Sequence, residues 1–337
     1  MIRVLTTIDA HVGGQPFRLV VDGMPQPKGS TLDRRRDWLS RHADGLRRAL
    51  VLPPRGHADM MAAVLTPPVT AGAHAGVVFM DGAGYPGVSG HGIMALTTIA
   101  LERSLFFSRE FDDVEARLVF DTPAGSVRAV ARLETHGDAR RVDTVAVTGA
   151  PAFVYGASQP VTVGSRTLRV DLAFGGAFYA IVDTEAAGVP LDAARLPDLR
   201  RLGVEICRAL NASVSPRHPV DAAANDVAGV VFTGPAHDPE AHLRNVLVRS
   251  AGSVDLSASG TGTAAVMAVL DAMGLLPDGQ PFVHEGLAGA LLRGRVTGRT
   301  VVGDTPGLVI EIAGSSWITG EHTLFLDDDD PLTMRLS

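Results

Sequence analysis

The chain of 337 residues contains a single cysteine, Cys207. One cysteine excludes an internal disulfide and any zinc site built from several cysteines. Cys207 lies within a helical apolar pattern, so we expect it to pack in a core rather than to react. The spacing of His57, His74 and His91 matches no metal-ligand motif, and we expect no metal site.

The chain also lacks an excess of positive charge and a long apolar run. Its 30 Lys and Arg residues are outnumbered by 37 Asp and Glu residues, which gives a formal net charge of −7. A nucleic-acid partner requires a basic face, so we expect none. No apolar run approaches the roughly 18 residues of a membrane span, and Met1 to Leu5 alternates like a strand without signal-peptide architecture. We therefore expect a cytoplasmic protein without a membrane segment.

What the chain does contain is typical of a globular protein, with 46% hydrophobic and 20% charged residues. Its length is sufficient for two domains that each bury a core. The proline-containing stretch Thr148 to Pro151 is the expected boundary. We therefore expect an N-terminal half over residues 1–148 and a C-terminal half over 149–317, with the segment of about 318–337 as a candidate to rejoin the first half.

A short motif occurs twice, about half a chain apart. Ser89-Gly90-His91-Gly92 precedes an apolar run at 93–101, and Ser259-Gly260-Thr261-Gly262 precedes a second run at 263–273. Serine is a preferred helix N-cap, and the first turn of a helix leaves backbone N–H donors unpaired. Such a helix start attracts anions. We expect two buried helices whose starts hold one small carboxylate between the two serines.

Other interpretations of these turns are less consistent with the sequence. Each motif taken alone could be an ordinary helix cap. A nucleotide-binding loop would end in Gly-Lys-Ser or Gly-Lys-Thr, and a serine-hydrolase elbow would have the pattern Gly-x-Ser-x-Gly, and neither is present here. The pairing of two motifs, each before an apolar helix, favours a functional site.

Strand-like segments precede the central helix in both halves, so the pattern predicts an α+β fold. A strand, a glycine-rich turn, a second strand and a helical stretch follow one another in each half. These stretches are Ile2 to Thr7, Phe17 to Val21 and Leu32 to Leu50 in the first half, and Leu168 to Leu172, Phe178 to Val182 and Leu196 to Asn211 in the second.

The chain resembles the proline racemase family, which includes hydroxyproline 2-epimerases and trans-3-hydroxy-L-proline dehydratases. The resemblance covers nearly the whole chain and implies a diaminopimelate-epimerase-like fold. In that fold two pseudo-symmetric halves each have a strongly curved sheet around a central helix, and the active site lies in the cleft between them. The matching segments are 9–16, 55–57, 89–92, 174–180, Asp255 with Ser257, 260–262 and 328–332.

The resemblance also implies which residues are catalytic. In the family, the position of Ser89 is usually a cysteine that takes the proton from Cα of a cyclic amino acid. The position of Ser259 is a cysteine in racemases and epimerases and a threonine in dehydratases. A thiol titrates near 8.5, whereas a serine hydroxyl is a much weaker acid and requires activation by its surroundings.

Substrate-binding residues are implied in the same way. Gly90, Gly260 and Thr261 match positions whose backbone holds the substrate carboxylate. The residues that match contacts to the ring nitrogen are His91 and Asp255, and His218 matches a further substrate contact. The resemblance implies no metal and no organic cofactor.

These residues favour dehydration over epimerisation. Epimerisation needs an acid and a base on opposite faces of Cα, whereas dehydration needs one base and help for the departing hydroxyl. The hydroxyl of Ser259 is closer to the threonine of the dehydratases, and Arg55 to Met60 and Gly175 to Tyr179 resemble that subgroup. We therefore expect a trans-3-hydroxy-L-proline dehydratase. The alternatives are a hydroxyproline 2-epimerase or proline racemase, and a non-catalytic imino-acid binding protein. In each case the expected partner is a small imino acid, with a homodimer as the candidate assembly.

Overall fold

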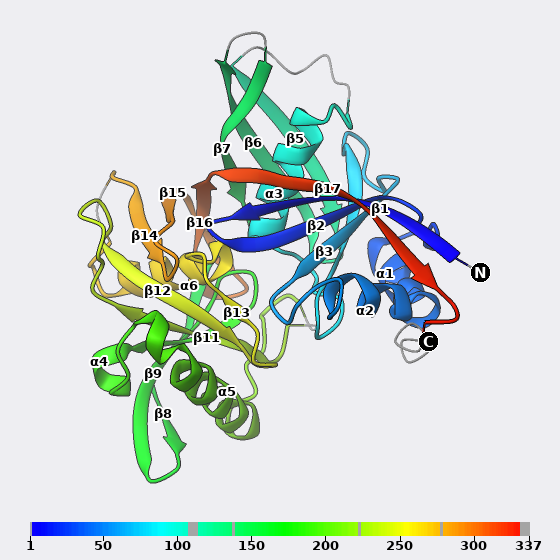
Figure 1. Ribbon diagram of the computed structural model, residues 1–337. Coiled ribbons are helices and arrows are strands. Elements are labelled where there is room, and N and C mark those ends of the chain that lie inside the picture. The colour runs from blue at the N-terminus through cyan, green and yellow to red at the C-terminus, as the bar shows by residue number, and fades with distance from the viewer. Residues whose placement is uncertain (1, 107–113, 137–138, 222–223, 277–278, 331–337) are drawn as a thin grey trace. The chain divides into compact units, whose positions relative to one another are not determined.

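The computed structural model describes residues 2–106, 114–136, 139–221, 224–276 and 279–330 (Figure 1). Contacts between Cα atoms divide the chain into two compact units. Unit 1 contains the residues up to Val147 together with the segment from Ser315 on, and unit 2 contains Thr148–Gly314. Both units are built from a mixed sheet, outer helices and one central helix.

The elements of unit 1 follow one plan of strands interrupted by helices. In chain order they are β1 (Ile2–Val12), β2 (Gln15–Asp22), α1 (Leu32–His42), α2 (Asp44–Val51), β3 (Met61–Thr66), β4 (Ala75–Met80), α3 (Gly90–Glu102), β5 (Glu115–Thr122), β6 (Gly125–His136), β7 (Ala139–Thr148) and β17 (Ser316–Asp327).

Unit 2 repeats this plan. Its elements are β8 (Phe153–Val163), β9 (Arg166–Phe174), β10 (Phe178–Asp183), α4 (Thr184–Ala187), the short helix η1 (Ala193–Arg195), α5 (Leu196–Ser213), β11 (Val227–Gly234), β12 (Leu243–Arg249), β13 (Val254–Asp255), α6 (Gly260–Ala272), β14 (Phe282–Gly286), β15 (Leu291–Val302) and β16 (Thr305–Gly314).

The strand pairings show that the two halves are pseudo-symmetric, as the sequence predicts. In unit 1 the pairs β1/β2, β3/β4 and β5/β6 are antiparallel, and β2/β3 and β4/β5 are parallel. In unit 2 the pairs β9/β10, β11/β12 and β14/β15 are antiparallel, and β10/β11 and β12/β14 are parallel. Parallel neighbours need a crossover. Helices α1 and α2, α3, α5 and α6 lie within these crossovers.

Alternate side chains of β4 face different helices of unit 1. Val78 and Met80 belong to the core that α1 and α2 cover. Phe79 packs instead against the start of α3. Its ring lies so close to Gly92 that a Cβ added there would be only 2.6 Å from it. Successive side chains of a strand point to opposite faces, so both faces of this strand are covered. This explains why the stretch from Ala75 to Met80 is apolar throughout rather than alternating.

The same arrangement occurs on β11 in unit 2. Phe232 packs near Gly203 of the outer helix α5, and Val231 lies beside Gly262 at the start of α6. The core between α5 and the sheet also contains Cys207, which is 1% exposed. Burial raises the pKa of the Cys207 thiol to about 12, so the thiolate is scarce at neutral pH. The packing role predicted for this cysteine is confirmed.

One helix prediction is wrong in detail. The helical spacing from Leu32 to Leu50 predicts one helix, whereas the structure has two, α1 and α2. Ala43 separates them, with φ −141° and ψ 17°, outside the helical region. The second helix begins at Asp44, whose carboxylate accepts a hydrogen bond from Nε of Arg47 at 2.6 Å. A break of one residue leaves the apolar spacing intact and is therefore invisible to a periodicity argument.

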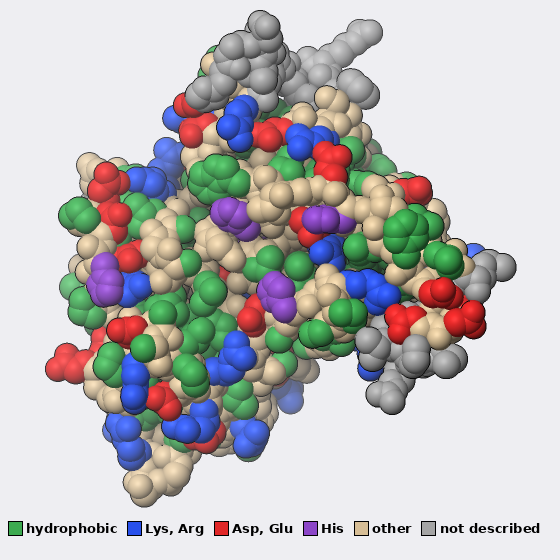
Figure 2. Space-filling model, viewed as in Figure 1, with side chains coloured by type: hydrophobic (Ala, Val, Ile, Leu, Met, Phe, Trp, Pro, Cys, Tyr) green, Lys and Arg blue, Asp and Glu red, His purple; other side chains and the backbone are tan. Residues whose placement is uncertain are grey.

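Charged side chains of both signs are interspersed on the surface. Figure 2 shows Lys and Arg side chains next to Asp and Glu side chains on the visible face. On α1, for example, Arg36 pairs with Asp33 at 3.0 Å and with Asp37 at 3.5 Å.

Within the described ranges, no helix combines the length and the apolar character needed to cross a membrane.

Candidate active site

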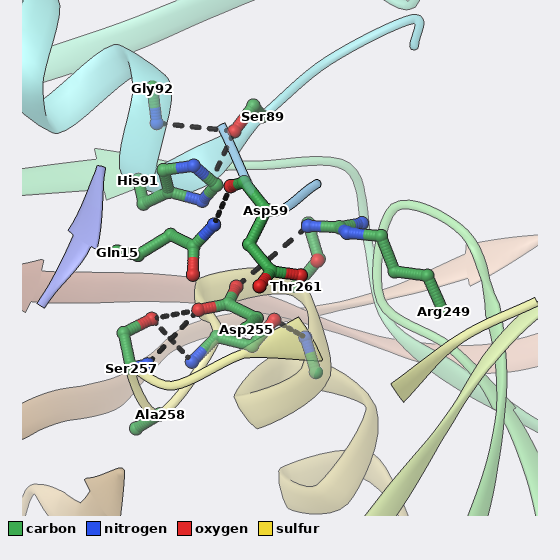
Figure 3. A network of polar contacts seen from close by, with 12 residues as sticks. Gln15, Asp59, Ser89, His91, Gly92, Arg249, Asp255, Ser257, Ala258 and Thr261 are labelled. Atoms are coloured by element: carbon green, nitrogen blue, oxygen red, sulfur yellow. Dashed lines mark hydrogen bonds and ion pairs between the residues drawn. The ribbon is translucent and has the colours of Figure 1, made fainter. Parts of the chain in front are cut away.

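The first serine turn lies at the start of α3 in unit 1. Ser89 is the N-cap, in extended conformation, and its Oγ accepts a hydrogen bond from the Gly92 N–H at 3.1 Å. Oγ also lies 3.3 Å from Nδ1 of His91, and both residues are buried (Figure 3). The expectation that this turn begins a buried helix is confirmed. Gly90 and His91 supply the first backbone N–H groups of the helix, which have no acceptor within it.

The contact between Ser89 Oγ and His91 Nδ1 was not indicated by the sequence. The resemblance implies that His91 touches the ring nitrogen of a substrate, and it gives no reason to place the imidazole beside the serine hydroxyl. Because Oγ already accepts from the backbone, its own hydrogen is available to an unprotonated Nδ1. An imidazole at this distance is a suitable base for a hydroxyl that is otherwise a poor acid.

The second serine turn lies at the start of α6 in unit 2. Ser259 is the N-cap, is 2% exposed, and accepts a hydrogen bond at Oγ from the Gly262 N–H at 3.3 Å. Its backbone conformation differs from that of Ser89, with φ 53° and ψ 111°. The N–H groups of Gly260 and Thr261 have no acceptor within the helix, and a helix start of this kind can bind an anion. This start of a buried helix was also predicted.

Asp255 precedes this turn on the short strand β13 and is completely buried. Its Oδ1 accepts hydrogen bonds from Oγ of Ser257 at 2.6 Å and from the Ser257 N–H at 3.1 Å, and Arg249 Nη2 lies 3.8 Å from Oδ2 (Figure 3). The same Ser257 hydroxyl accepts from the Ser259 N–H at 3.1 Å. Ser257 therefore connects the carboxylate to the serine turn, a role that the family match of Ser257 alone did not indicate.

A glycine turn between β9 and β10 packs against the first residues of α6. A Cβ on Gly175 would lie 2.2 Å from the carbonyl oxygen of Thr261, so only glycine fits. The hydroxyl of Tyr179, at the start of β10, lies 2.9 Å from Oγ1 of Thr261, and Tyr179 is buried. The motif that carries these residues thus fixes the helix start from outside the helix.

A polar cluster lies beneath the second turn. Asn245, Thr263 and His284 are all fully buried. Nδ2 of Asn245 lies 2.9 Å from Nε2 of His284, and Oγ1 of Thr263 lies 2.9 Å from Nδ1 of the same ring. Asn245 Nδ2 and Thr263 Oγ1 both donate to the carbonyl oxygen of Ala258, at 2.8 Å and 2.9 Å. This bond uses the one hydroxyl hydrogen of Thr263, so Thr263 Oγ1 accepts from the ring N–H at Nδ1 of His284. Sequence reasoning missed this cluster, although polar residues within the apolar strands β12 and β14 were the available sign.

Acid should destabilise the fold through His284. Burial lowers the pKa of His284 to about 3, whereas a histidine in an unfolded chain titrates near 6.5. Between these values the unfolded chain binds a proton that the folded chain does not. The contribution of neutral His284 to the free energy of unfolding is therefore fully present above about pH 6.5. It decreases by about 1.4 kcal/mol per pH unit as the pH falls towards about 3. Urea unfolding at several pH values between these limits measures the slope.

The control for this experiment is His284→Gln, which keeps a polar side chain but does not titrate. Its unfolding free energy should depend on pH less steeply than that of the parent over the same range. Equal slopes in the two proteins would show that His284 is not the group responsible.

His218 lies outside both serine turns in the sequence, and its contacts are with residues of its own loop and with two phenylalanine rings. Its Nδ1 accepts from the N–H groups of Val220 and Asp221 at 3.3 Å and 3.0 Å. Its ring packs against Phe153 and Phe174, with centroids at 5.3 Å and 4.5 Å. Burial lowers the pKa of His218, which favours the neutral imidazole. A substrate contact by His218 stays a prediction.

In the part of the chain that the structure describes, no group of three or more His, Cys, Asp or Glu side chains could hold a metal ion.

Gln15 belongs to the polar surroundings of the first turn. Its Nε2 donates to the Asp59 carbonyl oxygen at 2.8 Å (Figure 3). Gln15 and Asp59 both lie at or next to segments that the family resemblance matched.

The two units, each with a mixed sheet and a buried central helix that begins at a serine turn, define the diaminopimelate-epimerase-like fold. A solved hydroxyproline epimerase from Agrobacterium vitis, with trans-4-hydroxy-L-proline bound, has this fold with a TM-score of 0.86 and 29% identity. The match covers 97% of this chain and 94% of that chain. The predicted fold class is confirmed.

The chain belongs to the proline racemase family, whose model, described as Proline racemase, matches residues 7–335. A trans-3-hydroxy-L-proline dehydratase of Bacillus cereus is 36% identical over 330 residues, which cover 98% of this chain and 97% of the relative. A 3-hydroxyproline 2-epimerase of Burkholderia multivorans is 36% identical over 332 residues, with the same coverage. These similarities support an enzyme and include both a lyase and an isomerase.

Proposed function

We propose that this protein dehydrates trans-3-hydroxy-L-proline to pyrroline-2-carboxylate without a cofactor. The observation that carries the proposal is the difference between the two serines. Ser89 has an imidazole nitrogen 3.3 Å from its Oγ. Among the described residues, the Ser259 hydroxyl is hydrogen-bonded to a backbone N–H, that of Gly262, and not to a titratable group. One serine with a base partner suits dehydration, whereas epimerisation needs a base on each face of Cα.

In the first step Ser89 takes the proton from Cα. The Cα–H bond breaks, its proton passes to Oγ, and the original hydroxyl proton passes to Nδ1 of His91. The electron pair moves towards the substrate carboxylate, whose developing charge is stabilised by backbone N–H groups at the helix start. We assign this stabilisation to Gly260 and Thr261, with Gly90 at the other helix start.

In the second step the hydroxyl at C3 leaves. The C3–O bond breaks as Cα and C3 form a double bond, and the departing oxygen takes a proton from the Ser259 hydroxyl to leave as water. Solvent then returns a proton to the Ser259 oxygen, and His91 releases to solvent the proton that it took from Ser89. The product is an enamine, which isomerises to pyrroline-2-carboxylate. Asp255, buried and negatively charged, would pair with the ring nitrogen of the bound imino acid while these bonds change.

NMR in D₂O with trans-3-hydroxyproline, 4-hydroxyproline and proline in turn tests the proposal. A dehydratase consumes trans-3-hydroxyproline and produces pyrroline-2-carboxylate. Deuterium at Cα with inversion and without loss of water from the ring would assign an epimerase or racemase instead. Binding without exchange or consumption would assign a non-catalytic imino-acid binding protein.

A variant separates the two steps of the proposed reaction. Ser259→Ala should still exchange the Cα proton of trans-3-hydroxyproline with solvent, because Ser89 and His91 are intact. It should form product more slowly than the parent, because the leaving oxygen lacks its proton donor. Equal product formation by parent and variant would remove Ser259 from the mechanism.

Gly175→Ala should weaken binding of the substrate carboxylate. The new methyl group would lie 2.2 Å from the Thr261 carbonyl oxygen and 2.6 Å from the Ala265 nitrogen, so the first turn of α6 must shift. We expect affinity for hydroxyproline to fall about tenfold and the fold to lose about 1–3 kcal/mol. Calorimetry and thermal unfolding measure the two effects. Gly149→Ala is the control, since its Cβ would meet no atom within 4 Å.

A further inference from the structure

The two serine turns match in sequence but differ in backbone conformation. Ser89 has φ −143°, in the extended region that any residue adopts. Ser259 has φ 53° and ψ 111°, which an L-amino acid with a side chain rarely adopts. A strained residue of this kind persists only when the surrounding structure holds it in place. Unit 2 must therefore contain contacts that hold Ser259, and these contacts are not required for Ser89.

Hydrogen bonds to the peptide before Ser259 supply this constraint. The Ala258 carbonyl oxygen accepts from both Asn245 Nδ2 and Thr263 Oγ1, at 2.8 Å and 2.9 Å. On the other side of the same peptide, the Ser259 N–H donates to Ser257 Oγ at 3.1 Å. Both polar groups of this peptide are thus occupied by side chains, and its orientation is fixed.

His284 holds the two donors in turn. Its Nδ1 lies 2.9 Å from Thr263 Oγ1 and its Nε2 lies 2.9 Å from Asn245 Nδ2, and all three side chains have no exposed surface. Burying polar groups is costly unless they satisfy one another, and apolar residues would fill the same space without that cost. In unit 1 the residue that corresponds to Thr263 is Ile93, which is apolar. At this position a polar residue therefore accompanies the strained serine, and an apolar residue accompanies the relaxed one.

We infer that Asn245, Thr263 and His284 are positioning residues that hold the Ala258–Ser259 peptide in its strained orientation. By fixing this peptide they direct the Ser259 hydroxyl and the N–H groups of the α6 start. The inference rests on the proposed function and assigns to this function three residues that do not themselves contact the substrate.

Thr263→Val tests the inference because it removes one hydroxyl at nearly constant shape. Turnover of trans-3-hydroxyproline should fall by about tenfold to a hundredfold, since a small displacement of a catalytic group has effects of this size. Thr263→Ser, which keeps the hydroxyl, should restore most of the turnover. The matched control is Thr97→Val, since Thr97 is equally buried on α3 and its Oγ1 donates to the Ile93 carbonyl oxygen at 2.7 Å. The control should keep parental turnover.

A double-mutant cycle distinguishes positioning from general stability. In a Ser259→Ala background, Thr263→Val should reduce turnover further by only about twofold or less, because the hydroxyl that it positions is gone. Additive losses, or equal losses in Thr263→Val and Thr97→Val, would overturn the inference. If Thr263→Val does not fold, Asn245→Ser is used in the same cycle and the same outcomes apply.

Crystal structures give a result that does not depend on activity. In Thr263→Val the φ of residue 259 should move out of the positive region, and in Thr97→Val it should stay positive. An unchanged positive φ in Thr263→Val would contradict the inference. Should the parent fail to convert any imino acid, the proposed function fails, and the φ of Ser259 in these variants still decides whether the cluster holds the turn.

Discussion

Replacing Ser89 by alanine is expected to reduce turnover of trans-3-hydroxy-L-proline by about a thousandfold, within the range attributed to general acid–base groups. The affinity for the substrate should change by less than about threefold, because the carboxylate is assigned to backbone N–H groups that the substitution does not touch. His91 remains in the variant but loses the hydroxyl through which it acts. Steady-state kinetics and calorimetry with the same ligand separate the two quantities.

Ser89 also caps α3, so the variant needs a stability control. Its Oγ accepts from the Gly92 N–H, and loss of an N-cap costs about 1 kcal/mol. Thr31 caps α1 by the same type of bond, to the Arg34 N–H at 3.3 Å. Thr31→Ala should lose similar stability and keep full turnover. If Ser89→Ala converts the substrate as fast as the parent, Ser89 is not the base.

A thiol in place of the hydroxyl gives the opposite result. Ser89→Cys should raise turnover at neutral pH, since a thiol titrates near 8.5 and a much larger fraction is ionised than for serine. The gain depends on proton abstraction being the slow step, which a slower reaction of Cα-deuterated substrate would establish. A loss of turnover together with a substrate isotope effect would show that sulfur is misplaced at this position.

The features that the sequence predicted correctly depend on local chemistry. Ser89 and Ser259 cap helices because their hydroxyls accept from N–H groups three residues later, a geometry contained within one turn. The apolar helices that follow are buried because they carry almost no charge. Cys207 could be assigned to a core because its helical neighbours are apolar at the correct spacing.

Which residues meet in the polar cluster could not be predicted, because this depends on strand pairing. Asn245 and His284 are 39 residues apart, and the parallel pairing of β12 with β14 brings them together. Nothing in either strand alone specifies that partner. The φ of Ser259 was equally hidden, since a positive φ is expected at glycine and the residue here is serine. Its conformation is determined by neighbours distant in sequence.

Removing the negative charge of Asp255 is expected to have the second large effect, on binding. Asp255 is fully buried and its Oδ1 is held by two bonds from Ser257. We propose that it pairs with the positively charged ring nitrogen of the imino acid. A hydrogen bond to a charged group is worth about 1.5–3 kcal/mol, so Asp255→Asn should weaken binding by about tenfold to a hundredfold. Asp255→Ala should weaken it at least as much.

The control is a buried carboxylate with a purely structural role. Asp121 in unit 1 is 2% exposed and accepts from the N–H groups of Val69 and Thr70, both at 2.8 Å. Asp121→Asn should therefore lower stability without changing the affinity for an imino acid measured by calorimetry. Asp255→Asn should instead change affinity for an imino acid far more than for a simple carboxylate that lacks the ring nitrogen. Equal losses for both ligands would mean that Asp255 supports the shape of the turn, and unchanged affinity for both would show that it does not contact the ligand.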